Sequence, residues 1–173
     1  MKRRKFIGAS AAASVGLLAT TTSSAMPIVK RNIKKELKGN IQHSACRWCY
    51  SKIPMEEFLK NLNNLGVKAM DLTGPEDWPL MKKYDIHASM CWGAGLGIEK
   101  GWNNPDLHEE LIADYLRVIP LVAEAGYKNL ICFSGNRNGM NDLVGLENCV
   151  TGLQQILPTA KEHGVVIQME LLN

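Results

Sequence analysis

The sequence predicts an α/β fold built on a parallel sheet. Short apolar runs of strand length alternate with longer segments whose apolar residues recur every three or four positions, which is helical spacing. Strands that alternate with helices in this way form a parallel sheet with right-handed crossovers. Polar residues also gather directly after several strand-like runs, and this favours a (β/α) barrel, with its ligand site at the strand ends, over an open sheet. We expect five strands and four helices.

Three strands and two helices are expected in the first half of the fold. The first long helix has apolar residues at Met55, Phe58, Leu59 and Leu62, and Gly66 ends it. In the order strand, helix, strand, helix, strand, the expected segments are 41–48, 54–65, 67–72, 75–83 and 86–92.

The second half begins with a helix whose start is marked by Asn104 as cap, Pro105 at the first helical position and Asp106 in the first turn. Gly126 ends this helix. A strand, a polar loop, a helix interrupted by Pro158 and a last strand are then expected at 129–134, 135–142, 146–163 and 165–173. The order of elements continues the β/α alternation of the first half.

A weak internal repeat supports this order. Val118-Ile-Pro120 with Gly126 is repeated 38 positions later by Ile156-Leu-Pro158 with Gly164, and an apolar strand follows each time. The repeat predicts one β/α unit, with a similarly kinked helix, used twice.

Glu170 is the anomaly of the last strand, which we expect to be buried. If side chains alternate across that strand, Val166, Gln168 and Glu170 share one face. A buried carboxylate is costly unless a cation or strong donors compensate its charge. Two interpretations are open: Glu170 forms a structural ion pair with a Lys or Arg, or it is a metal ligand and acid/base group at the mouth of the fold.

Other polar and aromatic residues near strand ends are weaker candidates for substrate binding. Arg137 can form a fork with a substrate carboxylate, and Asn136 and Asn138 can bind hydroxyl groups. The alternative is that these three residues satisfy a tight loop bounded by glycines.

Two tryptophans and one aspartate complete the candidate set. Trp48 and Trp92 can wall a site and exclude water, although core packing explains aromatic residues at strand ends equally well. Asp71 is a candidate for orienting a neighbouring site residue. The glycine-rich loop 93–97 lacks dinucleotide-binding spacing, and we interpret it as a mobile loop over the site.

The charge distribution argues against a nucleic-acid surface. The whole chain carries a net charge of +3, but its first 38 residues hold nine basic residues and one acidic residue, so the remaining 135 carry −5. Phosphate binding depends on clustered Lys and Arg. We therefore expect no nucleic acid as a partner.

Five cysteines are an odd number without the density of a disulfide scaffold. Cys46 and Cys49 form a single C-x-x-C, which lacks the second pair of ligands that a structural zinc site needs. A thiol-redox role for this pair is a remote alternative. Cys46, Cys91 and Cys132 are interpreted as small apolar residues at strand positions.

Residues 1–25 are typical of an export signal. A basic start precedes a short apolar run that ends in Ser23-Ser-Ala25, whose small residues suit cleavage. Arg3 and Arg4 before Lys5-Phe6-Ile7 resemble a twin-arginine signal, and an ordinary secretory signal is the alternative. We expect a periplasmic protein with no stable membrane anchor after cleavage, a basic linker at 26–40 and one domain from 41 to 173.

Three segments of that domain resemble the hydroxypyruvate isomerase family, within the xylose-isomerase-like TIM barrels of sugar isomerases and epimerases. They are residues 43–50 (HSACRWCY), 131–139 (ICFSGNRNG) and 169–173 (MELLN). The resemblance covers the domain but only about half of the family's fold. We therefore expect the front part of such a barrel, with about its first five strands and four helices.

The resemblance implies a catalytic role for Glu170, as one of two catalytic glutamates and as a ligand of a divalent metal (Mg, Mn, Zn or Co). The family's other ligands come from strands beyond the fifth. The implied reaction converts hydroxypyruvate to tartronate semialdehyde by metal-assisted proton transfer through an enediolate. A sugar epimerase or dehydratase on the same barrel, and a non-catalytic exported sugar-binding domain, are the alternatives. An oligomer is possible, because a fifth strand without a sixth neighbour is an open edge.

Overall fold

A computed structural model describes residues 41–172. The expected signal segment 1–25, the expected linker 26–40 and Asn173 lie outside this range. Among the described residues, no helix is long and apolar enough to cross a membrane.

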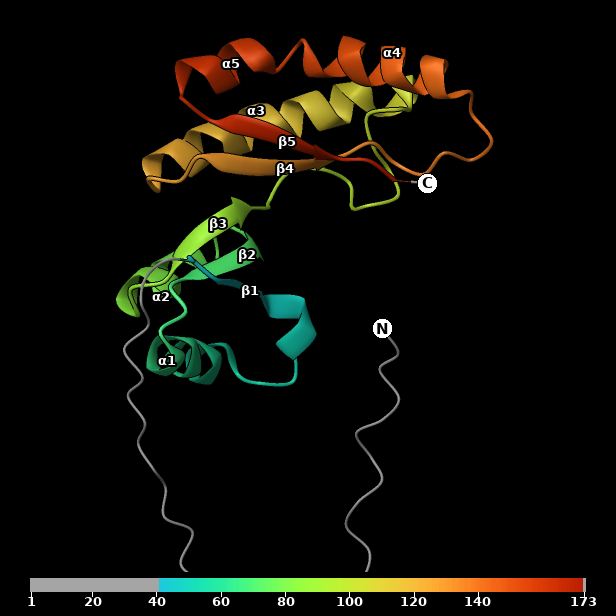
Figure 1. The fold of residues 1–173 in the computed structure, drawn as a ribbon. Helices are drawn as coiled ribbons and strands as arrows, with labels where there is room; N and C mark the ends of the chain where they lie inside the picture. The colour runs from blue at the N-terminus through green and yellow to red at the C-terminus, as the bar shows by residue number, and fades with distance from the viewer. Residues whose placement is uncertain (1–40, 173) are drawn as a thin grey trace, which may run out of the picture. The chain divides into compact units, whose positions relative to one another are not determined.

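The sheet has five parallel strands, and their spatial order is their order along the chain (Figure 1). This confirms the predicted parallel α/β arrangement. β5 pairs with β4 over its whole length, whereas β3 and β4 share a single recorded pairing, Cys91 with Leu130. The strands are β1 (Ser44–Cys46), β2 (Ala69–Thr73), β3 (His87–Cys91), β4 (Asn129–Phe133) and β5 (Val166–Glu170).

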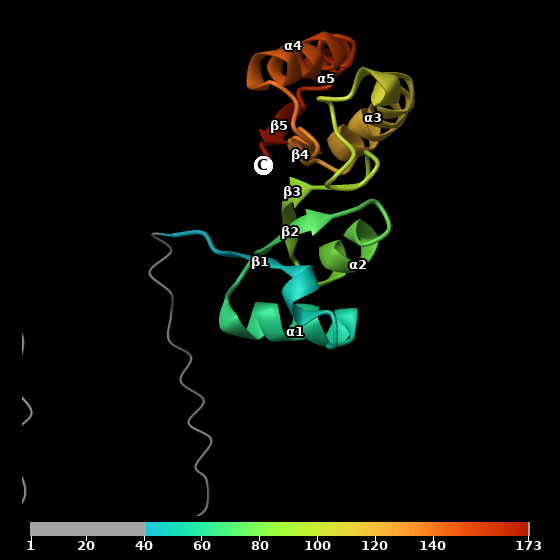
Figure 2. The same ribbon diagram turned by 90° about the vertical axis from the view of Figure 1, so that its right-hand side faces the viewer.

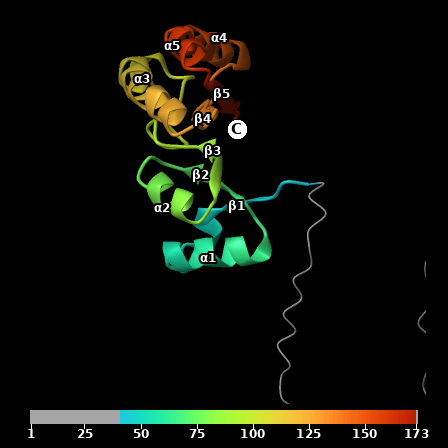
Figure 3. The ribbon, with the colours of Figure 1, turned by 90° about the vertical axis from the view of Figure 1, so that its left-hand side faces the viewer.

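The helices follow the strands in alternation and lie to one side of β2–β5, as Figures 2 and 3 show from opposite ends. The α-helices are α1 (Met55–Leu65), α2 (Trp78–Lys83), α3 (His108–Glu124), α4 (Asp142–Leu153) and α5 (Leu157–Glu162). Two short 3₁₀ helices are η1 (Arg47–Tyr50) and η2 (Pro105–Leu107). We call the opposite face of the sheet, which no described helix covers, the inner face.

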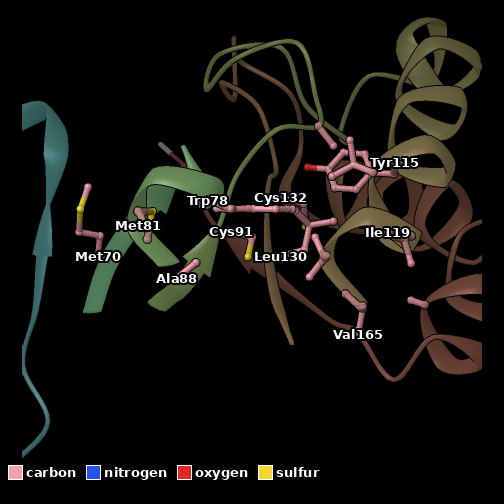
Figure 4. Packing of buried hydrophobic residues seen from close by; sticks show 14 of the residues in the cluster. Met70, Trp78, Met81, Ala88, Cys91, Tyr115, Ile119, Leu130, Cys132 and Val165 are labelled. Atoms are coloured by element: carbon pink, nitrogen blue, oxygen red, sulfur yellow. The ribbon is translucent and has the colours of Figure 1, made fainter. Parts of the chain in front are cut away.

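The core lies between the sheet and the helices, and Figure 4 shows part of it. Leu111, Tyr115, Val118 and Val122 of α3 lie three or four positions apart and are buried, so they form one apolar stripe of the helix. Leu130 and Cys132 of β4 pack into the same cluster and are fully buried. Leu130 and Cys132 therefore point toward the helices, and the alternate residues of β4 point to the inner face.

The segment expected as a helix over 146–163, interrupted by Pro158, begins earlier than predicted and is divided just before that proline. It forms two helices, α4 and α5. α4 starts at Asp142 because the side chain of Asn141 accepts a hydrogen bond from the Leu143 N–H (3.0 Å) and caps it.

The predicted repeat of a similarly kinked helix is also wrong. Pro120 lies inside α3, which continues to Glu124, whereas Pro158 lies in the first turn of α5. A proline is tolerated in the first turn because the N–H that it lacks would have no partner within the helix there. The two prolines therefore occupy unlike positions, and Pro158 marks a helix start.

The last strand is parallel, as predicted, but it is not buried. β5 is an edge of the described sheet, and Val166 and Glu170 are exposed. An apolar strand becomes buried only when strands pair with it on both sides, and among the described residues β5 pairs with β4 alone.

Candidate functional site

Glu170 lies at the carboxyl end of β5, on the inner face. Ile167 and Met169 pack against the core cluster, so alternation turns Val166, Gln168 and Glu170 to the other side. This is the face that the sequence assigned to them. None of the ion pairs among the described residues includes Glu170, and its side chain is exposed. Of the two interpretations of Glu170, the structural ion pair has no support in the described part of the chain.

An aromatic pair lies next to the Glu170 position. Phe133 is in register with Glu170 across the β4–β5 ladder, and the rings of Phe133 and Trp92 meet edge to face with centroids 5.6 Å apart. Phe133 is buried and Trp92 is half-buried. Trp92 therefore lies at the carboxyl ends of the strands, beside Phe133. The sequence did not single out Phe133, which is both the ring partner of Trp92 and the ladder partner of Glu170.

A row of polar side chains crosses the inner face below these residues. The hydroxyls of Ser44 and Ser89 donate to the two carboxylate oxygens of Asp71 (2.6 and 2.5 Å). The Asn129 amide donates to the Ser89 carbonyl (2.8 Å), and Gln168 donates to the Asn129 side chain (3.0 Å). Asp71 thus has partners on both neighbouring strands and joins three strands of the sheet.

The β4–α4 loop uses its predicted binding residues for its own structure. Arg137 Nε lies 3.0 Å from the Asp142 carboxylate and donates to the Met140 carbonyl. The Asn136 N–H donates to the Glu99 carbonyl (2.9 Å). Asn138 is exposed with a φ of 47°, which asparagine adopts more readily than most residues. Of the two interpretations of this loop, the geometry favours a tight, internally satisfied turn.

Asn103 holds this loop, and sequence reasoning missed it. Its side chain is buried and donates to the carbonyls of Gly135 (3.3 Å) and Asn136 (2.9 Å). The backbone of Gly101 crosses so close to Gly135 that a Cβ on Gly101 would lie 2.2 Å from the Gly135 nitrogen. The nearby Asn104 did stand out in the sequence as a helix cap, and its side chain does accept from the Asp106 N–H (3.1 Å). The hydrogen-bond partners of Asn103 lie more than thirty residues away along the chain, so no local pattern distinguishes Asn103 from Asn104.

A cavity of about 430 Å³ lies beside β5, but on the helix side of the strand. Met169 and Leu171 line it together with Leu146 and Cys149 of α4, while Glu170 does not. Arg137 also lines this cavity. This cavity and the candidate acid/base group are thus on opposite sides of β5. We place the candidate site at Glu170 because the carboxylate that could transfer a proton is there.

Trp48 and Arg47 do not join the site. Trp48 lies on η1 and is 69% exposed, so neither predicted role, site wall or core packing, is seen. Arg47, which follows β1, donates to the carbonyl of Ile53 (2.7 Å). Its guanidinium carbon lies over the Phe58 ring, 5.6 Å from the ring centroid. Both residues belong to the β1–α1 connection.

The glycine-rich loop is fastened to α3. The Gly95 N–H donates to the Asp114 carboxylate (2.7 Å), and Arg117 donates to the Gly93 carbonyl (3.2 Å). These contacts argue against a loop that swings freely over the site.

All five cysteines are free thiols. Cys91 and Cys132 are fully buried strand residues, which confirms their interpretation as apolar side chains, and burial raises the pKa of each to about 12. Cys46 is half-buried and Cys49 is exposed. Burial also raises the pKa of Cys46, which is the opposite of what activates a nucleophilic thiol.

The described residues do not complete a metal site. Among residues 41–172 no three His, Cys, Asp or Glu side chains come together as ligands. A divalent ion of the kind implied by the resemblance takes several oxygen or nitrogen ligands, and Glu170 offers one carboxylate. The donor set therefore does not fit a bound metal by itself.

Five parallel strands in sequential order, with helices between successive strands, match part of a TIM barrel of the xylose-isomerase-like type. The structure is similar to an AP endonuclease of family 2 from Brucella melitensis, with a TM-score of 0.62 at 15% identity over 77% of this chain and 56% of that one. It is also similar to the 3-keto-D-glucoside 4-epimerase YcjR from E. coli in its apo form (TM-score 0.58, 14% identity, 77% and 57%). A third similar structure is a xylose isomerase domain containing protein from Salmonella typhimurium LT2 (TM-score 0.54, 13% identity, 73% and 47%).

These similarities establish the fold, which the sequence predicted correctly. The chain spans about half the length of the solved structures that it matches. No protein-family model and no curated protein sequence matches it.

Proposed function

We propose that Glu170 is an acid/base carboxylate of a sugar-modifying enzyme on this barrel, of the isomerase or epimerase type. The observation that carries the proposal is the position of Glu170. It is exposed, forms no ion pair with any residue of 41–172, and lies at the carboxyl end of a barrel strand, on the inner face and in register with Phe133. Carboxyl ends of barrel strands are where enzymes of this fold keep their catalytic groups. A structural carboxylate on the same face, Asp71, has two hydrogen-bond partners, whereas Glu170 is available to a ligand.

The proposed chemical step is a proton transfer next to a carbonyl. The Glu170 carboxylate removes the proton from the carbon beside the substrate carbonyl, which leaves an enediolate and a neutral carboxylic acid. Return of that proton to the former carbonyl carbon, together with transfer of the hydroxyl proton to the former carbonyl oxygen, completes an isomerisation. Return from a second acid to the opposite face of the same carbon completes an epimerisation. The described residues offer a divalent metal a single ligand, Glu170, so no part of this step is assigned to a metal.

For the substrate we propose a small hydroxy-keto acid or sugar. Hydroxypyruvate, which would give tartronate semialdehyde, follows from the resemblance of residues 43–50, 131–139 and 169–173. The similar E. coli protein is a 3-keto-D-glucoside 4-epimerase, and this favours sugar epimerisation as the second candidate. A nuclease activity like that of the similar AP endonuclease is not proposed, because residues 39–173 carry a net charge of −5.

Deuterium exchange tests the proposal without requiring a complete reaction, because one base is enough to exchange a proton. The full chain in D₂O should exchange the C3 protons of hydroxypyruvate, followed by NMR, and a keto-hexose is the second probe. Glu170→Gln should slow the catalysed exchange by about 100-fold or more. Both probes are run with and without added Mg²⁺ or Mn²⁺.

Glu162→Gln is the matched control, since it makes the same chemical change at an exposed carboxylate on α5. Equal exchange by the wild type and Glu170→Gln would reject Glu170 as the base. Binding of the probe that survives Glu170→Gln, without any exchange in the wild type, would favour the non-catalytic sugar-binding alternative.

We further propose that the protein is exported through the twin-arginine route, on the strength of Arg3 and Arg4. Replacing both by Lys should abolish the appearance of the mature chain in the periplasmic fraction of a bacterial host. Unchanged export of this variant would indicate an ordinary secretory signal instead.

A further inference from the structure

Cys46 and Cys49 lie on a single turn of 3₁₀ helix. Cys46 is the last residue of β1 and the N-cap of η1, with an extended backbone (φ −87°, ψ 122°), and Cys49 is the third residue of that helix. A 3₁₀ helix has three residues per turn and rises about 2.0 Å per residue, so side chains three positions apart eclipse and their Cα atoms lie about 6 Å apart. Disulfides join Cα atoms that are roughly 4.4–6.8 Å apart. The spacing of the two cysteines on this turn therefore suits a bond between them.

The electrostatics of Cys46 indicate that the two thiols lie near each other. Burial raises the pKa of the Cys46 thiol, and the charge of the Cys49 thiolate acts in the same direction. A like charge has this effect only at short range. Cys49 is exposed and Cys46 is half-buried, so an external reagent meets Cys49 first.

Arg47, between the two cysteines, holds the turn in place. Its guanidinium donates to the carbonyls of Tyr50, Ser51 (3.4 Å) and Ile53 (2.7 Å) and lies over the Phe58 ring. All of these contacts lie within the β1–α1 connection and the first turn of α1. A turn that is already fixed loses little conformational freedom when a bond closes across it. The bond should therefore form more readily in the folded protein than in the unfolded chain.

We propose that Cys46 and Cys49 form a reversible disulfide by exchange with a disulfide oxidant of the glutathione type. The Cys49 thiolate attacks one sulfur of oxidised glutathione, forms a mixed disulfide and expels one glutathione thiolate. The Cys46 thiolate then attacks the Cys49 sulfur, closes the internal bond and expels the second glutathione. The protein loses two protons and two electrons, and the oxidant gains them as two glutathione thiols.

The proposed bond modifies the fold and is not a catalytic redox centre. It fastens the turn that follows β1, at the same end of the sheet as Glu170, because the carboxyl ends of parallel strands share one edge. The inference is independent of the proposed reaction, since it is tested by counting thiols and not by turnover.

The first test counts thiols in the full chain. The reduced protein is equilibrated with mixtures of reduced and oxidised glutathione, alkylated under denaturing conditions and measured by mass spectrometry. The expected result is the loss of two thiols per chain without bound glutathione, while the three buried cysteines, Cys91, Cys132 and Cys149, remain thiols. A stable adduct with one glutathione, a disulfide between two chains, or no reaction would overturn the proposal.

Trypsin identifies the bond, because it cleaves after Arg47 and therefore between the two cysteines. The unreduced digest should contain peptide 39–47 linked to peptide 48–52, and reduction should separate them. An uncleaved peptide 39–52 that is lighter by two hydrogens would identify the same bond. A link from either peptide to another cysteine would overturn the pairing.

The second test compares the folded and unfolded chain. The equilibrium constant for disulfide formation with glutathione should be about tenfold or more larger in buffer than in concentrated urea, because only the folded chain holds the turn. By linkage, closing the bond should lower the equilibrium constant of unfolding by the same factor. Equal constants in buffer and in urea would overturn the inference that the turn is prepared for the bond.

Arg47→Ala tests what fixes the turn. This variant loses the contacts to three backbone carbonyls, so its constant in buffer should fall by about threefold or more while its constant in urea is unchanged. Lys52→Ala is the matched control, since it removes the same charge from an exposed lysine of the same connection. Circular dichroism verifies that both variants fold. An equal effect of both would mean that charge, and not the turn, sets the constant, and would overturn the role of Arg47.

Discussion

Two carboxylates on the inner face illustrate how neighbouring residues decide what a side chain is available for. Asp71 accepts hydrogen bonds from Ser44 and Ser89, whereas Glu170 has no ion pair among the described residues. A carboxylate whose oxygens are already bound contributes to stability, and one that is exposed at a strand end is available for chemistry.

Asp71→Ala should therefore destabilise the fold by about 1–2 kcal/mol, because two hydroxyls lose their acceptor. Asp71→Asn should cost less, since one acceptor oxygen remains. Urea unfolding measures both. Asp85→Ala is the control: its ion pair with Lys68 is on the surface and should contribute below about 1 kcal/mol. If Asp71→Ala costs no more than Asp85→Ala, the polar row does not stabilise the sheet.

The sequence predicted the place of Glu170 because strand alternation and strand ends are local properties. It could not predict the partners of Asp71 or the burial of Asn103, since those contacts join residues 18 to 33 positions apart. The exposure of Trp48 was not predicted for a related reason. A position just after a strand suggests a site, but η1 turns the tryptophan toward solvent.

At the scale of elements, α4 shows which local signals decide a boundary. Its start was predicted four residues too late because Asn141 and Asp142 were assigned to the polar loop, although an asparagine followed by an acid is a helix cap signal. Its apolar residues are spread around the helix, with Cys149 and Gly152 buried and Leu143 exposed. Such a helix carries no clear amphipathic period, so the sequence could not show which face is buried.

Two glycines of α4 give a matched test of its packing. A Cβ on Gly152 would lie 2.6 Å from the Trp102 ring, whereas a Cβ on Gly145 would meet the flexible Met140 sulfur at 3.3 Å. Gly152→Ala should destabilise the protein by about 1–3 kcal/mol through overpacking. Gly145→Ala should be neutral or stabilising by up to about 1 kcal/mol, because alanine favours helix. Thermal unfolding that ranks the two variants in the reverse order would contradict the contact between α4 and Trp102.

For the whole molecule, the predicted parallel order was correct because β/α alternation leaves little freedom in topology. The burial of β5 was not predictable in the same way. The apolar composition of a strand indicates that it suits a buried position, but the neighbours that bury it are a property of the assembled sheet.

Because of the buried thiols, the free energy of unfolding should decrease as the pH rises in the alkaline range. Burial raises the pKa of Cys91 and of Cys132 from the ordinary value of 9.0 to about 12. The folded state keeps both protons between these values while the unfolded chain releases them. This contribution to stability is therefore complete below pH 9 and is lost as the pH rises toward 12. Burial raises the pKa of Tyr115 as well, which acts in the same direction at higher pH.

Urea unfolding should accordingly show a loss of about 2–3 kcal/mol between about pH 8 and about pH 10. A Cys91→Ala, Cys132→Ala double variant should be less stable at the lower pH, because it leaves small cavities, but its loss on going to the higher pH should be much smaller. The difference isolates the two thiols from every other group that titrates in this range. An equal loss in the wild type and the double variant would mean that these cysteines ionise in the folded protein as easily as in the unfolded chain, and would contradict their burial between the sheet and the helices.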